Sequence, residues 1–253
     1  MIEIAIAIYL ACGASESERP MRCEWWEGEE MALTQTMRTE YETKFQTCTV
    51  KPEFAGNVET VITRSMKARP RYEAVASKTN VPWHVIAVIH NLECSGRFDC
   101  HLHNGDPLRR RTVNVPAGRP LKGKGPFTWE ESAIDALTYD RFTTWTDWSV
   151  AGTLYKIESY NGMGYRKRGI PSPYLWSGSQ HYARGKYVAD GKFDPKAISS
   201  QLGAAVVLRR MDDQALIDLD PRPARVTPNP LAAPVWPVPE RGGNAALRAL
   251  LDD

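Results

Sequence analysis

The segment "NVPWHVIAVIHNLE", residues 80–93, constrains the fold more than any other part of the chain. Its interior is apolar on nearly every face, and a helix of that kind is stable only when other elements surround it. Asn80 and Pro82 fit the start of such a helix, because asparagine is a good helix cap and proline is tolerated in the first turn. We therefore expect a central buried helix that ends near Glu93, in a domain large enough to enclose it.

Helical patterns also dominate the rest of the chain. Apolar residues recur every fourth position in residues 33–45, which gives one apolar stripe along a helix. Pro70 is expected to end the helix that includes residues 58–66, because proline disfavours helical geometry in the residue before it. Thr128 and Glu131 have the spacing of a capping box and should open a further helix. The remaining helices are expected at residues 70–78, 152–161 and 195–211, the last of them capped by Asp194.

Residues 99–127 break this periodicity and are rich in Gly, Pro, Asn and Asp. Their stretch "RRRTVNVPAGRP" is compatible with a short strand or hairpin. We therefore expect a mainly α domain over residues 31–218, with a small irregular or β insertion after the buried helix. Residues 219–253 are proline-rich and are expected to form an extended tail.

Residues 1–30 are expected to be an N-terminal extension outside this domain. Their opening "MIEIAIAIYLACGAS" is apolar but too short to span a bilayer. No Lys or Arg precedes the apolar run, so it is a poor signal peptide, and a weak export segment is the alternative. We expect no stable membrane span in the chain.

The charge and the cysteine content exclude several classes of protein. A net charge of +2 is too small to indicate a nucleic-acid partner. Five cysteines without a C-x-x-C pair exclude zinc-ribbon and thioredoxin-type motifs, while a disulfide between Cys94 and Cys100 is sterically conceivable. Basic residues cluster in residues 109–124 and 166–186. They are either solvated loop charges or a surface for an anionic polymer such as a bacterial cell wall.

Glu93 is the candidate catalytic residue, because it lies at the end of the buried helix. The C-terminus of a helix carries partial negative charge, which disfavours an ionised carboxylate there. Burial beside Trp83, Ile86 and Ile89 would withdraw water and raise the pKa further. A carboxyl group prepared in this way donates a proton near neutral pH, as glycosidic cleavage requires. A glutamate turned out to solvent is the alternative.

The segment "HNLECSGRFDCHLHNGDPL", residues 90–108, also raises the question of a metal site. His90, His101 and His103 could approach Glu93, but no H-E-x-x-H pattern is present, and spacing this loose is common by chance. We therefore interpret His90 as a structural histidine that orients its neighbour, and we expect neither a metal nor a cofactor. A thiol nucleophile at Cys94 is disfavoured, because nothing in the sequence orients the histidine for it.

The order of these motifs resembles that of the lysozyme superfamily. "LECSGRF" looks like the catalytic-glutamate motif of goose-type lysozymes and lytic transglycosylases, and "ESYNGMGYR" looks like their Tyr-Asn-Ala-Gly segment. Further stretches, among them "HLHNGDPL", "VPAGRP" and "SPYLWSGSQHYARGKYVADGKFDP", resemble phage and bacterial endolysin-like lysozymes, with similarity running from about residue 31 to residue 211. The resemblance implies a lysozyme-like fold and a glycosidase that cleaves peptidoglycan between N-acetylmuramic acid and N-acetylglucosamine.

The resemblance also implies roles for single residues. Glu93 would be the general acid, and Tyr160 and Asn161 would line the cleft. Asp106, in an Asn-Gly-Asp turn, would supply a second carboxylate. Cys94 stands where the family has serine, and the Gly-Leu-Met-Gln segment of transglycosylases is absent, so hydrolysis and transglycosylation both stay open. The other substrate-binding candidates are His90, His103, Tyr174, Trp176 and Tyr182.

We therefore expect a monomeric enzyme whose partner is the glycan strand of peptidoglycan. It would act at the bacterial cell wall or in the periplasm, either after export or after release from the cytoplasm during phage lysis. Two other functions are compatible with the sequence. One is a noncatalytic wall-binding module on the same fold, and the other is a metal-dependent hydrolase that uses His90, His101 and His103. Chitin is an alternative glycan, because the acid chemistry is the same.

Overall fold

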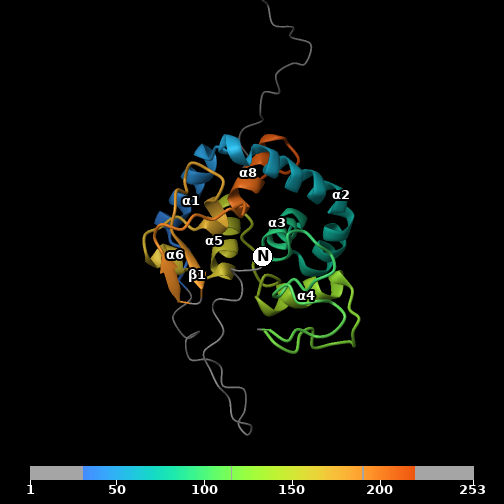
Figure 1. Ribbon diagram of the computed structural model, residues 1–253. Coiled ribbons are helices and arrows are strands. Elements are labelled where there is room, and N and C mark those ends of the chain that lie inside the picture. Colours follow the sequence, from blue (N-terminus) through green and yellow to red (C-terminus); the bar gives the residue numbers. More distant parts are fainter. Residues whose placement is uncertain (1–30, 115, 190, 220–253) are drawn as a thin grey trace, which may run out of the picture. The chain divides into compact units, whose positions relative to one another are not determined.

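The computed structural model describes residues 31–114, 116–189 and 191–219, in which the fold is mainly helical, as predicted (Figure 1). The helices are α1 (Gln35–Thr47), α2 (Ala55–Thr79), α3 (Trp83–Cys94), α4 (Trp129–Tyr139), α5 (Val150–Asn161), α6 (Gly164–Lys167), α7 (Pro173–Trp176) and α8 (Ala204–Asp213), with a short 3-10 helix at Pro52–Phe54. The strands are β1 (Lys186–Ala189) and β2 (Lys192–Asp194). None of the helices in these ranges is long and apolar enough to cross a membrane. The predicted extension over residues 1–30 lies outside the described residues, and so does the predicted tail apart from Leu219.

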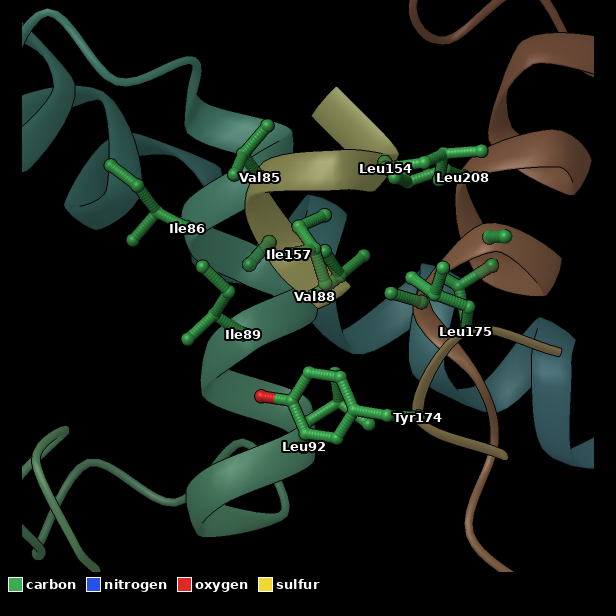
Figure 2. Close-up of a cluster of buried hydrophobic side chains, with 14 of the residues drawn as sticks. Val85, Ile86, Val88, Ile89, Leu92, Leu154, Ile157, Tyr174, Leu175 and Leu208 are labelled. Atoms are coloured by element: carbon green, nitrogen blue, oxygen red, sulfur yellow. The ribbon is translucent and has the colours of Figure 1, made fainter. Parts of the chain in front are cut away.

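Helix α3 lies among the other helices, as its apolar sequence predicted (Figure 1). It packs against α2 and α8. Figure 2 shows Val88 of α3 in one buried cluster with Ile157 of α5 and Leu175 of α7. Burying one such aliphatic side chain contributes about 1.5–3 kcal/mol. The position of α3, and therefore of its last turn, is fixed by contacts from several helices.

Two predicted helix boundaries near α3 are wrong. Helix α2 continues through Pro70, because packing holds both halves, with Ile62 buried before the proline and Tyr72 buried after it. Asn80 is the C-cap of α2, with a left-handed φ of 57°, and Pro82 is the N-cap of α3. Asparagine tolerates left-handed backbone better than most residues, so it serves here to end one helix instead of starting the next.

The last predicted helix begins later than expected. Asp194 ends β2, and its Oδ1 accepts hydrogen bonds from the backbone N–H groups of Lys196 and Ala197 at 2.8 and 3.3 Å. Aspartate caps such local turns as well as helices. Residues 195–203 are therefore irregular, and α8 begins at Ala204.

The segment between α3 and α4 is irregular, as predicted, but residues 95–114 and 116–128 contain no strand. Their one β feature is an isolated bridge between Cys100 and Pro107. The sheet within the described residues pairs β1 with β2 and follows α7, so of the two forms expected after α3, irregular or β, the described residues take the irregular one. The Arg111 guanidinium supplies hydrogen-bond donors to backbone carbonyl groups, as the N–H groups of a neighbouring strand would in a sheet. It donates to three backbone carbonyl oxygens, those of Gly118, Leu121 and Gly123.

Helix α4 begins with the predicted capping box, and this gives a test of the fold. Thr128 Oγ1 accepts from the Glu131 N–H at 3.2 Å, and Glu131 Oε2 accepts from the Thr128 N–H at 2.8 Å. We predict that Thr128→Ala lowers the free energy of unfolding by about 1 kcal/mol. Thr138→Ala, at an exposed position of the same helix, is the matched control and should change it by less than about 0.5 kcal/mol. Urea unfolding followed by circular dichroism measures both, and equal losses would contradict the capping assignment.

Candidate active site

Glu93 is the second-last residue of α3 and is partly accessible as a residue. The chain leaves the helix at Ser95, which is the C-cap and has a left-handed φ of 52°. Protein atoms surround the carboxyl group, and this burial raises the pKa of Glu93 from 4.5 to about 7. A hydrogen bond from Tyr174 opposes the increase in pKa, and the negative charge of Asp140 adds to it. The raised pKa predicted from the end of the helix is confirmed, so Glu93 is not a solvated surface glutamate.

Two tyrosines complete the surroundings of Glu93. Tyr174 of α7 donates its hydroxyl to Glu93 Oε1 at 2.7 Å, and Figure 2 shows its ring near Leu92 in the last turn of α3. Tyr160, in the last turn of α5, has its ring centroid 6.5 Å from that of Tyr174. Burial, together with the charge on Glu93, raises the pKa of both hydroxyls well above 10.0, so both stay protonated donors. The structure thus brings together three predicted residues from three separate helices.

Asp140 is a second carboxyl group of the site, and sequence reasoning missed it. It is the C-cap of α4 and is partly accessible. Burial raises the pKa of Asp140 to about 7, and the positive charges of Lys156 and Arg119 oppose that increase. Its own charge acts on Glu93 and on both tyrosines, which places it near all three. Only the tertiary placement of α4 brings Asp140 here, so no local spacing could have identified it.

Asp106, the predicted second carboxylate, instead holds the irregular segment together. It is buried, and its oxygens accept from the backbone N–H groups of Val113 and Asn114 at 2.8 and 3.0 Å. The side-chain amides of Asn114 and Asn104 donate to it at 2.7 and 3.2 Å. Burial raises the pKa of Asp106, but these four bonds outweigh it and leave the pKa below its ordinary value. A carboxylate engaged in this way has a structural role, and the catalytic role of Asp106 stays a prediction.

His90 and His103 do not reach the accessible part of the site. His90 is fully buried, with Nδ1 2.9 Å from the Tyr72 hydroxyl and Nε2 2.7 Å from the carbonyl oxygen of Arg97. The side chain of His103 is also buried, and its Nε2 lies 2.9 Å from Asp135 Oδ2. Burial lowers the pKa of both imidazoles to about 4, so both are neutral at pH 7. The predicted substrate contacts of these histidines are therefore wrong.

The metal-dependent alternative lacks a ligand set. His101 contacts Ser132 Oγ through Nδ1 and the carbonyl oxygen of Arg110 through Nε2, both at 2.8 Å. Its ring nitrogens are therefore engaged, as are those of His90. In the part of the chain that the structure describes, no group of three or more His, Cys, Asp or Glu side chains could hold a metal ion. These histidines instead tie the irregular segment to its neighbours.

Trp176 and Tyr182 belong to the core and do not line the site. Each is only 2% exposed. The Tyr182 hydroxyl accepts from the Ser199 N–H at 3.1 Å and donates to the carbonyl oxygen of Gly185 at 3.2 Å. Their glycine- and serine-rich surroundings suggested an open loop, but the loop packs inward. Asn161 is the last residue of α5 and partly accessible, so its substrate contact stays a prediction.

The raised pKa of Glu93 predicts a specific pH dependence of stability. A carboxyl group whose pKa is raised on folding contributes fully below pH 4.5, and its contribution is lost as the pH rises through about 7. Between about pH 5 and about pH 8, wild type should lose on the order of 1–3 kcal/mol through this group.

Glu93→Gln has no carboxyl group at this position, so its free energy of unfolding should not decrease by this amount between the two pH values. It should therefore be more stable than wild type at about pH 8. Glu73→Gln, at an exposed position of α2, is the matched control and should follow wild type. Urea unfolding at the two pH values measures the difference. Parallel pH profiles of wild type and Glu93→Gln would show that the carboxyl group is not desolvated.

Comparisons with known proteins add no assignment. No protein-family model matches the chain, and no match was found among curated proteins or solved structures. The lysozyme resemblance therefore stays a prediction from the sequence, and the geometry around Glu93 is the basis for a functional proposal.

Proposed function

We propose that this protein is a peptidoglycan-cleaving glycosidase with a lysozyme-like fold and Glu93 as its general acid. The bond cleaved joins N-acetylmuramic acid to N-acetylglucosamine. One observation carries the proposal. Glu93 is a partly accessible residue whose carboxyl group has a pKa of about 7 and accepts a hydrogen bond from the Tyr174 hydroxyl at 2.7 Å. A general acid works best when its pKa is near the working pH, because it is then both protonated and acidic enough to donate.

The contacts of Glu93 suit the transfer of one proton. Tyr174 donates to Oε1, so the acid proton is carried on Oε2. As the glycosidic bond breaks, that proton moves to the leaving-group oxygen and Glu93 becomes a carboxylate. The hydrogen bond from Tyr174 lowers the pKa of Glu93, which means that it stabilises the carboxylate formed by the transfer. Tyr174 is therefore a positioning residue that also makes the proton easier to release.

Asp140 takes the place of Asp106 as the second carboxylate of the proposal. Lys156 and Arg119 favour its ionised form. As an anion it raises the pKa of Glu93 and keeps the acid protonated before catalysis. The same charge would stabilise the positive charge that develops on the sugar ring in the transition state. Burial raises the pKa of Asp140 to about 7, so its ionised form becomes populated as the pH approaches that value, and in this form it assists Glu93, which carries the proton.

A cationic loop before α4 supports an anionic wall polymer over neutral chitin as the substrate. Arg109, Arg110, Lys122 and Lys124 are all exposed. The two arginines and the two lysines come from separate stretches of the segment. These stretches lie against each other at Gly125, the residue after Lys124, where an added Cβ would be only 2.4 Å from the Arg109 carbonyl oxygen. The stem peptides of peptidoglycan carry carboxylates along the glycan strand, which chitin lacks. Clustered cations on this loop would attract such a strand.

Glu93→Gln tests the proposal. The amide cannot donate the proton, so the rate of peptidoglycan cleavage should fall by about 10²–10⁴-fold. Wild-type activity should also decrease as the pH rises through about 7, because Glu93 loses its proton. Release of new reducing ends or of anhydro-sugars from purified peptidoglycan measures the rate and separates hydrolysis from transglycosylation.

Glu73→Gln is the matched control and should keep full activity. Unchanged cleavage by Glu93→Gln would remove Glu93 from the mechanism. Binding of wild type to the wall without any new product would instead favour the noncatalytic wall-binding module.

Asp140→Asn tests the second carboxylate. Loss of the negative charge should lower the pKa of Glu93, so the alkaline limb of the pH–activity profile should move down by about 0.5–1 unit. Asp99→Asn, at an exposed position of the segment after α3, is the control and should leave the limb in place. An unchanged or upward-shifted limb in Asp140→Asn would contradict the assigned role.

A further inference from the structure

Cys94 and Cys100 form a pair of thiols directly beside Glu93. Cys94 is the last residue of α3, and Cys100 lies in the irregular segment that follows. Both are free thiols and at most 3% exposed. Cys94 Sγ lies 4.0 Å from the carbonyl oxygen of Cys100. The Cys94 thiol is therefore placed against the Cys100 residue, as a disulfide between the two would require.

Arg97 makes the two thiols chemically unequal. Its Nη2 lies 4.0 Å from Cys100 Sγ. The neighbouring Cys94 side chain lowers the pKa of the Cys100 thiol, burial opposes this, and the guanidinium charge of Arg97 lowers it further. The neighbouring Cys100 side chain and burial both raise the pKa of the Cys94 thiol. Because the thiolate is the reactive form, Cys100 is the sulfur that reacts first.

We propose that Cys94 and Cys100 are a redox site that closes to a disulfide on reaction with a peroxide. The Cys100 thiolate attacks one oxygen of hydrogen peroxide, the O–O bond breaks, and a sulfenic acid and hydroxide form. The hydroxide takes up the proton that Cys100 released. The Cys94 sulfur then attacks the sulfenic sulfur, which forms the S–S bond and expels water. Two electrons pass from the two thiols to one peroxide, and dithiothreitol reverses the change.

The location of the pair connects this chemistry to the site. The Cys94 thiol donates a hydrogen bond to the carbonyl oxygen of His101 at 3.2 Å. Disulfide formation would remove the thiol proton and therefore this hydrogen bond. The disulfide would also tie the last turn of α3 to the segment whose Leu102 carbonyl oxygen accepts from the Tyr160 hydroxyl at 3.5 Å. Glu93 and Leu102, the hydrogen-bond partner of Tyr160, would then lie in segments joined by the disulfide. The redox site does not rest on the glycosidase proposal, because its test detects the disulfide itself and needs no measurement of glycosidase activity.

Peptide mapping of the full chain tests this redox site. Trypsin cleaves after Arg97, so the disulfide would join two otherwise separate peptides, residues 79–97 and 98–109. The protein is treated with hydrogen peroxide under native conditions, free thiols are alkylated, and the digest is analysed by mass spectrometry. We expect the joined pair in wild type and its separation by dithiothreitol. The pair should also form in Cys48→Ser, a control for another buried thiol, and be lost in Cys94→Ser and Cys100→Ser.

Three results would overturn the proposal. They are separately alkylated peptides after peroxide treatment, overoxidation of Cys100 without the joined pair, and a cross-link to Cys12 or Cys23 instead. Thermal unfolding gives a second measurement that needs no peptide assignment. Oxidised wild type should melt about 2–8 °C above the reduced protein, while Cys100→Ser should melt at one temperature under both conditions. Equal melting temperatures of oxidised and reduced wild type would also overturn it.

Discussion

The enclosure of α3 by other helices is the constraint on which the fold and the site both depend. Its side chains are apolar on nearly all sides, so α2, α8 and the cluster around Ile157 and Leu175 must surround it. That enclosure fixes the place where the last turn of α3 leaves the core. Glu93 lies in this turn, near enough to protein atoms to lose water and still partly accessible. The packing that stabilises the fold therefore also sets the acidity of the site.

The segment between α3 and α4 shows how irregular backbone can still be well defined. Buried side chains supply the partners that secondary structure would otherwise provide, among them Asp106, which accepts from two backbone N–H groups, and His101, which contacts Ser132 of α4. The same segment carries Cys100, whose carbonyl oxygen lies 4.0 Å from Cys94 Sγ. The Asp106 carboxylate and the imidazoles of His101 and His103, all buried, are committed to holding the segment in shape. The carboxyl groups of Glu93 and Asp140 differ from that of Asp106. Burial raises the pKa of both, and hydrogen bonds do not hold them in the ionised form.

The sequence predicted what depends on local pattern and missed what depends on tertiary placement. The all-apolar α3 and the capping box at Thr128 follow from local rules, and the structure confirms them, while the raised pKa of Glu93, also predicted, comes from burial by the tertiary packing. Pro70 and Asp194 were misjudged because tertiary packing and a local turn outweighed their usual preferences. Asp140 could not be found, since its neighbours in space are distant in sequence. The lysozyme-like architecture and the activity stay predictions.

An NMR titration of the Glu93 carboxyl group shows whether this group keeps its proton near neutral pH. The protein is labelled with carbon-13 only at the glutamate carboxyl carbons, so the similar titration of Asp140 does not interfere. We predict one resonance with a midpoint near pH 7 that is absent from Glu93→Gln. If every glutamate resonance completes its titration near the ordinary value of 4.5, Glu93 is ionised at neutral pH and the proposed acid has no proton to give.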